Sequence, residues 1–174
     1  MRNLGAAYLL IGGTVAAFVA MLAGIVMAVP GAWQFGLMPQ AIIQPVVALA
    51  ALTALVWCLM VGRRNLAVIN GNVSLRYFRT YTSDAPAEWV ERPTRAYMNL
   101  LEAPVLFYVA CALMLATGRY DSIQVILAWV FVAARCVHAF IHIGFNYVPL
   151  RFAAFFAGSL TLAVLWTRFA MQNL

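Results

Sequence analysis

The stretch that decides the fold runs from Arg92 to Phe107 and reads RPTRAYMNLLEAPVLF. At about 100° per residue, an α-helix through it places Arg95, Asn99 and Glu102 within about 60° of one another. Such polar groups are costly in a membrane-spanning helix unless they are paired and face protein or water. The shared face is therefore a candidate functional site.

The composition around this stretch is that of an integral membrane protein. The 174 residues are 66% hydrophobic and 9% charged, with a mean hydropathy of +0.91. A soluble domain of this length needs more polar surface. The net charge of +6 comes from arginine, without lysine. A nucleic-acid partner is not expected, because no basic face interleaved with aromatic residues is present.

Five apolar stretches are long enough to cross a hydrocarbon core of about 30 Å as helices. They cover residues 5–29, 41–62, 95–117, 122–143 and 151–170. We therefore expect an all-α fold with two parts. An additional transmembrane helix lies within residues 1–30, and a four-helix transmembrane domain covers residues 41–170. Pro104 should kink the third stretch.

Charge placement predicts the orientation in the membrane. The 63–94 connection is rich in arginine, whereas the 30–40 connection carries no charge. The positive-inside rule then places the N-terminus and the 63–94 loop in the cytoplasm.

Small residues follow one side of the 5–29 helix at four-residue spacing. They are Gly12, Ala16, Ala20 and Gly24. Such a stripe permits close packing with another membrane subunit, although small residues are also common in membrane helices generally. The three cysteines, Cys58, Cys111 and Cys136, all fall in apolar segments, so we expect core residues rather than disulfides.

The 122–143 stretch supplies a second polar face, on which Arg135, His138 and His142 lie within about 60°. Glu102 follows Pro93 by nine residues, and Arg135 precedes Gly144 by nine. Both would therefore lie about 13 Å from the same end of the bundle. A carboxylate and a guanidinium at equal depth should pair, so we predict a Glu102–Arg135 ion pair.

The charges on the two faces favour an anionic ligand. Arg95, Arg135 and Arg151 oppose a single Glu102. A small anion with planar carboxylates would suit arginine forks. Two other interpretations stay open: the pair only fixes helix register, and Arg95 and Arg151 only reach lipid phosphate. A metal is not expected at the two histidines, because a third ligand is not evident.

Arg95-Ala-x-x-Asn99-x-x-Glu102, followed by Pro104 and Phe107, resembles the second-helix signature of the MAPEG family, the membrane-associated proteins of eicosanoid and glutathione metabolism. Arg135-x-x-His138 and Pro149-x-Arg151 are similar to its third helix and the start of its fourth. The wording of the match, including His142, is most similar to a bacterial branch. The resemblance implies a four-helix bundle, a homotrimer with sites between subunits, and a bacterial inner-membrane location.

The resemblance also implies a cofactor and residue roles. Glutathione would be held by Arg95, Asn99, Glu102, Arg135 and His138, and the arginine at position 151 would stabilise its thiolate. His142 stands where prostaglandin-forming members have a tyrosine, and would replace the tyrosine hydroxyl as a hydrogen-bond donor. Met98 replaces a basic residue of those members. Phe152 and Phe155 replace hydroxyl side chains.

Two functions follow as expectations. The first is a glutathione-dependent transferase or peroxidase that acts on lipophilic electrophiles. The alternative is a non-catalytic accessory or scaffold subunit of a larger membrane complex, which the additional helix and the missing hydroxyls favour. A channel or transporter is less consistent with one polar site and no pair of broken helices.

Overall fold

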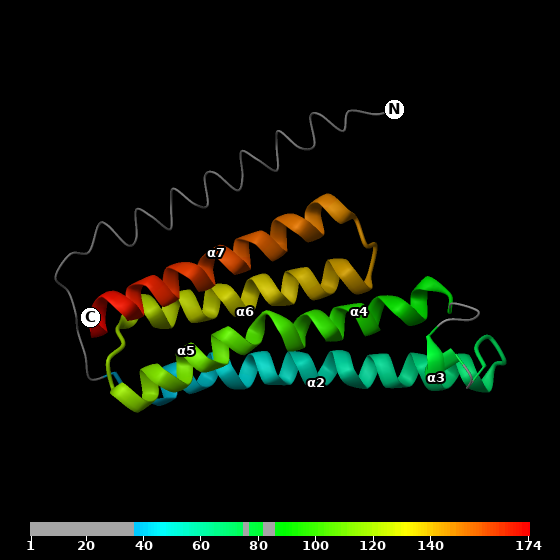
Figure 1. Cartoon of the computed structure of the whole chain (residues 1–174), viewed down its shortest axis with the longest axis horizontal. Coiled ribbons are helices and arrows are strands. Elements are labelled where there is room, and N and C mark those ends of the chain that lie inside the picture. Colours follow the sequence, from blue (N-terminus) through cyan, green and yellow to red (C-terminus); the bar gives the residue numbers. More distant parts are fainter. Residues whose placement is uncertain (1–36, 75–76, 82–85) are drawn as a thin grey trace.

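The computed structural model describes residues 37–74, 77–81 and 86–174 (Figure 1). The predicted helix over 5–29 and its stripe of small residues lie outside the described residues. The part that is described is all-helical, and four of its helical segments are long and apolar enough to cross a membrane. This agrees with the expected all-α integral membrane fold.

The four spans pack side by side into one bundle (Figure 1). The first is α2 (Gln40–Ile69), and the second is α4 (Glu88–Glu102) continued by α5 (Pro104–Thr117). The third is α6 (Ser122–Ile143) and the fourth is α7 (Val148–Asn173). The most extensive contact joins α6 to α7, and α4 packs against both α2 and α6. The core between them is apolar, with Phe107 stacked on Phe131 at a centroid distance of 4.8 Å.

The connection that we predicted over 63–94 is shorter than expected. Helix α2 continues to Ile69, and α4 already begins at Glu88. The apolar run ends before α2 does, but arginine is a good helix former, so Arg63 and Arg64 extend the helix beyond the apolar segment. Gly71 follows the end of α2 with a positive φ of 70°, a conformation that glycine adopts without steric cost.

The second span breaks where Pro104 predicted a disturbance. Helix α4 ends at Glu102, Ala103 lies between the two helices, and Pro104 opens α5. Proline has no amide hydrogen to donate to the preceding turn, so the helical hydrogen-bond pattern is interrupted there. The break separates a polar half of the span from an apolar half. Glu102 is the last polar residue before it.

At the end of the bundle where α6 begins, a buried ion pair joins α6 to α7. Asp121 and Arg168 are 2% and 3% exposed, and Arg168 Nη2 lies 2.6 Å from Asp121 Oδ2. Gln172 also donates to this oxygen, at 3.0 Å. The other carboxylate oxygen caps α6 by accepting from the amides of Ile123 and Gln124. This pair was not predicted from the sequence.

The short helix α3 (Tyr77–Thr80) lies outside the membrane-spanning helices and is held by a small apolar cluster of its own. Tyr77 packs with Ala67, Val73 and Val90. Its hydroxyl donates to Glu91 at 3.3 Å. Burial, and then the negative charge of Glu91, raise the pKa of Tyr77 above its ordinary value of 10.0.

We expect this raised pKa to make the α3 cluster sensitive to alkali. The neutral phenol is favoured in the folded state, so its contribution is complete below the unfolded pKa and is lost as pH rises through the folded pKa. Wild type should therefore lose more thermal stability than Tyr77→Phe between about pH 8 and about pH 11. Melting curves of both proteins in the same detergent check this. Parallel pH profiles would contradict it.

Candidate functional site

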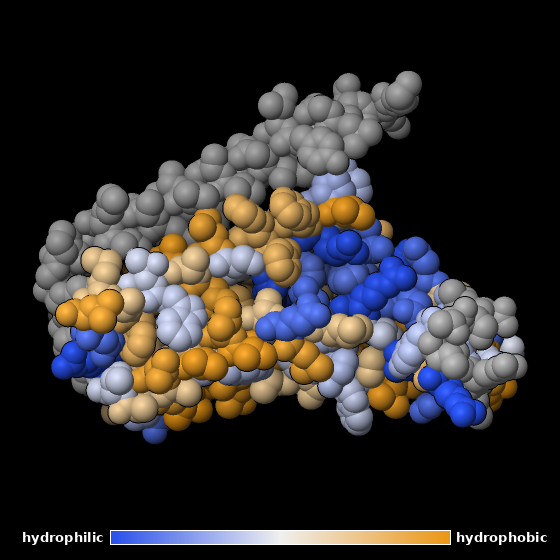
Figure 2. All heavy atoms as spheres, in the orientation of Figure 1, coloured by the Kyte–Doolittle hydropathy of each residue, from blue (hydrophilic) through white to orange (hydrophobic). Residues whose placement is uncertain are grey.

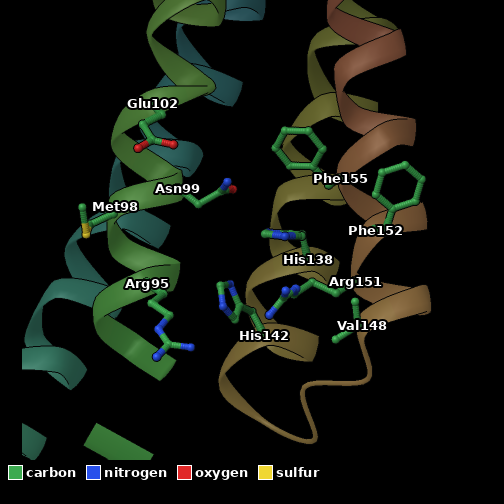
Figure 3. Close-up of a pocket in the computed structure, with 10 residues that line it drawn as sticks. All are labelled: Arg95, Met98, Asn99, Glu102, His138, His142, Val148, Arg151, Phe152 and Phe155. Carbon is green, nitrogen blue, oxygen red and sulfur yellow. The ribbon is translucent and has the colours of Figure 1, made fainter. Parts of the chain in front are cut away.

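A cleft of about 360 Å³ lies between α4 on one side and α6 and α7 on the other (Figure 3). Its size falls within the range of roughly 300–1,000 Å³ that is usual for small-molecule pockets. In Figure 2, hydrophilic side chains gather mainly toward the end of the bundle where α4 and α7 begin, and hydrophobic ones cover most of the remaining face. The lining residues are Arg95, Met98, Asn99, Glu102, His138, His142, Val148, Arg151, Phe152 and Phe155.

Helical periodicity explains why these residues meet. The α4 residues fall at positions i, i+3, i+4 and i+7 from Arg95, and the α7 residues follow the same spacing from Val148. Each set forms one helix face, and the two faces lie on opposite walls of the cleft (Figure 3). The cleft therefore brings together six of the seven predicted site residues: Arg95, Asn99, Glu102, His138, His142 and Arg151.

The seventh predicted residue, Arg135, lies behind the cleft. Its side chain is fully buried, at 0% exposure. It donates to the carbonyl of Phe155 at 2.8 Å, and to the side-chain oxygen of Asn99 at the long distance of 3.5 Å. The guanidinium carbon lies 5.2 Å from the ring centre of Phe131 and 5.0 Å from that of Phe155. Both rings are thus within the range of a cation–π interaction with this guanidinium.

The predicted Glu102–Arg135 ion pair is wrong. The salt bridges among the described residues are Glu88–Arg92 and Asp121–Arg168. Glu102 instead is exposed and lines the cleft. Our estimate from helix rise gave similar depths, but depth does not fix the direction in which a side chain leaves its helix. Arg135 turns toward the backbone of α7, and Glu102 turns toward the open space.

Arg135 reaches α7 because Gly158 leaves room for it. A Cβ atom at Gly158 would lie 2.5 Å from Nη2 of Arg135 and 3.0 Å from its Nε. Both distances are shorter than van der Waals contact. The glycine was not identified as a site residue in the sequence. Its place on α7, one turn beyond Phe155, is the signal that could have identified it.

The two histidines form a buried polar wall. His138 and His142 are 4% and 7% exposed, and their ring centres lie 5.5 Å apart in an edge-to-face arrangement. Both rings project toward the cleft in Figure 3. The Nδ1 atom of His142 is buried without a hydrogen-bond partner in the structure. A buried polar nitrogen is costly unless it is hydrogen-bonded, so this atom is suited to a ligand or a water. Clusters of three or more potential metal ligands are absent from the described residues.

The remaining wall of the cleft is apolar. Met98, Phe152 and Phe155 were already noted as departures from polar residues, and Val148 adds to them. Val148 was missed, although it precedes Arg151 by three residues on the same helix face. Met98, Val148 and Phe152 are more than half exposed in this chain. The cleft thus combines charged groups with an apolar side that opens outward.

Comparison with known proteins gives one match. A family model described as the MAPEG family matches residues 42–171, which is more than half of the chain and includes every residue of the cleft. Neither the curated proteins nor the solved structures contain a match to this chain.

Proposed function

The chain belongs to the MAPEG family, and from this premise we propose that the cleft binds glutathione for transfer to a lipophilic electrophile. The observation that carries the proposal is the charge arrangement of the cleft. Arg95 and Arg151 line it together with the single carboxylate of Glu102, and Arg135 lies buried behind them. This set favours a small ligand that carries more carboxylates than ammonium groups.

Glutathione fits that description, because it has two carboxylates and one ammonium group. Arginine forks bind planar carboxylates through paired hydrogen bonds. Glu102 is available for the ammonium group, and Asn99 and the unpartnered Nδ1 of His142 offer further hydrogen bonds. Charges on the cleft that complement those on the ligand support specific binding of glutathione.

Arg151 is the proposed catalytic residue. A guanidinium next to a thiol stabilises the thiolate and so lowers the thiol pKa. Bound glutathione supplies the nucleophilic sulfur, which bonds to the electrophilic carbon while the leaving group departs with its electron pair. The thiol proton passes to solvent. The apolar side of the cleft, with Met98, Phe152 and Phe155, would hold the lipophilic partner.

We also propose that a homotrimer in a bacterial inner membrane is the working form, with the Arg95 end of the cleft at the cytoplasmic side. Met98, Val148 and Phe152 are 55%, 56% and 59% exposed although they line the cleft. A neighbouring copy that covered them would close the cleft on its open side. Cover of this kind would exclude water and strengthen the electrostatic interactions inside.

Replacement of Arg151 tests the proposed function. In lipid nanodiscs with excess glutathione, wild type should show thiolate absorbance and conjugate an aryl halide. Arg151→Met should lower the conjugation rate by about 100-fold or more, because loss of a positioned charge at a reacting anion typically has this effect. Arg151→Lys should retain part of the rate. The matched control is Arg119→Met, at an exposed arginine that donates to Gln172 outside the cleft.

The same experiment distinguishes the non-catalytic alternative, which the apolar residues at positions 98, 152 and 155 favour. Folded wild-type protein that shows neither thiolate absorbance nor conjugation would overturn the enzymatic proposal. In that case an accessory or scaffold role within a larger membrane complex becomes the better explanation.

A further inference from the structure

The turn between α6 and α7 contains a residue in an uncommon backbone conformation. Asn146 has a φ of +51°, in the left-handed region that most residues with a side chain avoid. Asparagine is among the residues that tolerate this region best. Its backbone amide donates to the carbonyl of Ile141 at 2.8 Å, which ties the turn to the last turn of α6. The conformation is therefore fixed by a hydrogen bond.

The side chain of Asn146 contacts the proposed catalytic arginine. Its Oδ1 atom accepts from Nη1 of Arg151 at 2.6 Å. Hydrogen bonds from a charged donor are shorter and stronger than those between neutral groups. Arginine has several rotatable bonds, so a single strong contact to a fixed turn removes much of its freedom. The remaining N–H groups of Arg151 can then point to a ligand in the cleft.

The turn is also fastened to the opposite wall of the cleft. Arg92, on α4, donates to the carbonyl of Gly144 at 2.7 Å and pairs with Glu88 on its own helix. Gly144 itself has little room, because a Cβ atom there would lie 2.9 Å from the carbonyl of Phe140. Asn146 is thus held from α6 through its backbone, and the turn is held from α4 through Arg92.

We propose that Asn146 is a positioning residue for Arg151, and that its lack of charge is essential to this role. Aspartate would also tolerate the left-handed conformation and accept the same hydrogen bond. However, its carboxylate would offset the positive charge of Arg151 at the thiol. An amide orients the guanidinium and leaves its charge available. This inference rests on the proposed function of the cleft and adds a determinant of thiol acidity to it.

Two substitutions at Asn146 separate orientation from charge. Asn146→Gly keeps the positive φ and removes the acceptor, whereas Asn146→Asp keeps the acceptor and adds a negative charge. In nanodiscs, the pH profile of glutathione conjugation should shift upward by about one pH unit in both variants, which corresponds to a rate loss of about tenfold at a pH below the shifted value. Asn146→Asp should also raise KM for glutathione. Asn70→Gly, at the end of α2, is the matched control and should keep the wild-type profile.

A second readout does not depend on glutathione. The rate at which phenylglyoxal modifies Arg151, followed by mass spectrometry, reports how well the guanidinium is held. We expect several-fold faster modification in Asn146→Gly and no acceleration in Asn146→Asp or Asn70→Gly.

The two readouts distinguish failure of this inference from failure of the proposed function. One outcome is that the wild-type protein does not use glutathione while phenylglyoxal still modifies Arg151 faster in Asn146→Gly than in the other variants. In that case the positioning role is supported and the proposed function fails. If wild type is active and Asn146→Gly matches it in pH profile and in Arg151 reactivity, the positioning role is overturned.

Discussion

Asp121→Asn should lower the free energy of unfolding by about 3–5 kcal/mol, because it removes the negative charge from a buried ion pair. The two charges are both almost completely buried, and Gln172 adds a hydrogen bond to the same oxygen. Thermal melting in detergent, followed by circular dichroism, would show the loss. Asparagine keeps a side-chain oxygen that can cap α6, so the change isolates the ion pair from the cap.

Two further variants separate the contribution of the helix cap from that of the two buried charges. Asp121→Ala removes the cap as well and should cost about 1 kcal/mol more than Asp121→Asn. The double variant Asp121→Asn with Arg168→Leu removes both charges and should recover much of the stability, since paired removal of buried charges is often nearly neutral. A melting temperature of Asp121→Asn close to that of wild type would show that the pair contributes little. Glutathione binding should persist in folded Asp121→Asn, because the pair lies outside the cleft.

Gly158→Ala is expected to disturb the candidate site from behind. The new methyl group would lie 2.5 Å from Nη2 of Arg135, so the guanidinium must move. Arg135 is fully buried, so this movement would disturb its hydrogen bond to the Phe155 carbonyl and its contacts with two aromatic rings. Overpacking of this type costs about 1–3 kcal/mol. We expect this destabilisation together with at least about tenfold weaker glutathione binding, equivalent to about 1.4 kcal/mol.

The matched control is Gly62→Ala on α2. A Cβ atom at Gly62 meets nothing within 4 Å, so the substitution changes only the backbone entropy of a helix interior. We expect Gly62→Ala to be neutral or to stabilise the protein by about 0.5–1 kcal/mol. Melting curves of Gly158→Ala and Gly62→Ala measure their thermal stability, and isothermal titration measures their affinity for glutathione. Equal behaviour of the two glycine variants would mean that Arg135 moves without consequence.

Much of the fold follows from simple rules applied to the sequence. Apolar stretches of membrane length predict the four described spans, and Pro104 predicts the break in the second. The polar α4 residues of the cleft were also predictable, since 100° per residue is enough to assign Arg95, Asn99 and Glu102 to one face. These features depend on local geometry alone.

The partners of the charged residues could not be predicted in the same way. The Glu102–Arg135 prediction used depth along the helices and ignored the direction of each side chain. The shorter of the two hydrogen bonds of Arg135 goes to a backbone carbonyl, which has no sequence signature. Asp121 and Arg168 are 47 residues apart, and only the cap at Asp121 and Gln124 was readable locally. Pairing across the bundle needs the packing of α6 on α7.

The break at Ala103 and Pro104 has a mechanical consequence. Helices α6 and α7 make the most extensive contact in the bundle, and the Asp121–Arg168 pair joins them at the end away from their connecting turn. They should therefore move as one rigid block. Helix α4 carries the facing wall and is interrupted just beyond Glu102. Entry and release of a ligand should then involve tilting of α4 about this break, which the Arg92–Gly144 contact and the packing of α4 on α2 and α6 oppose.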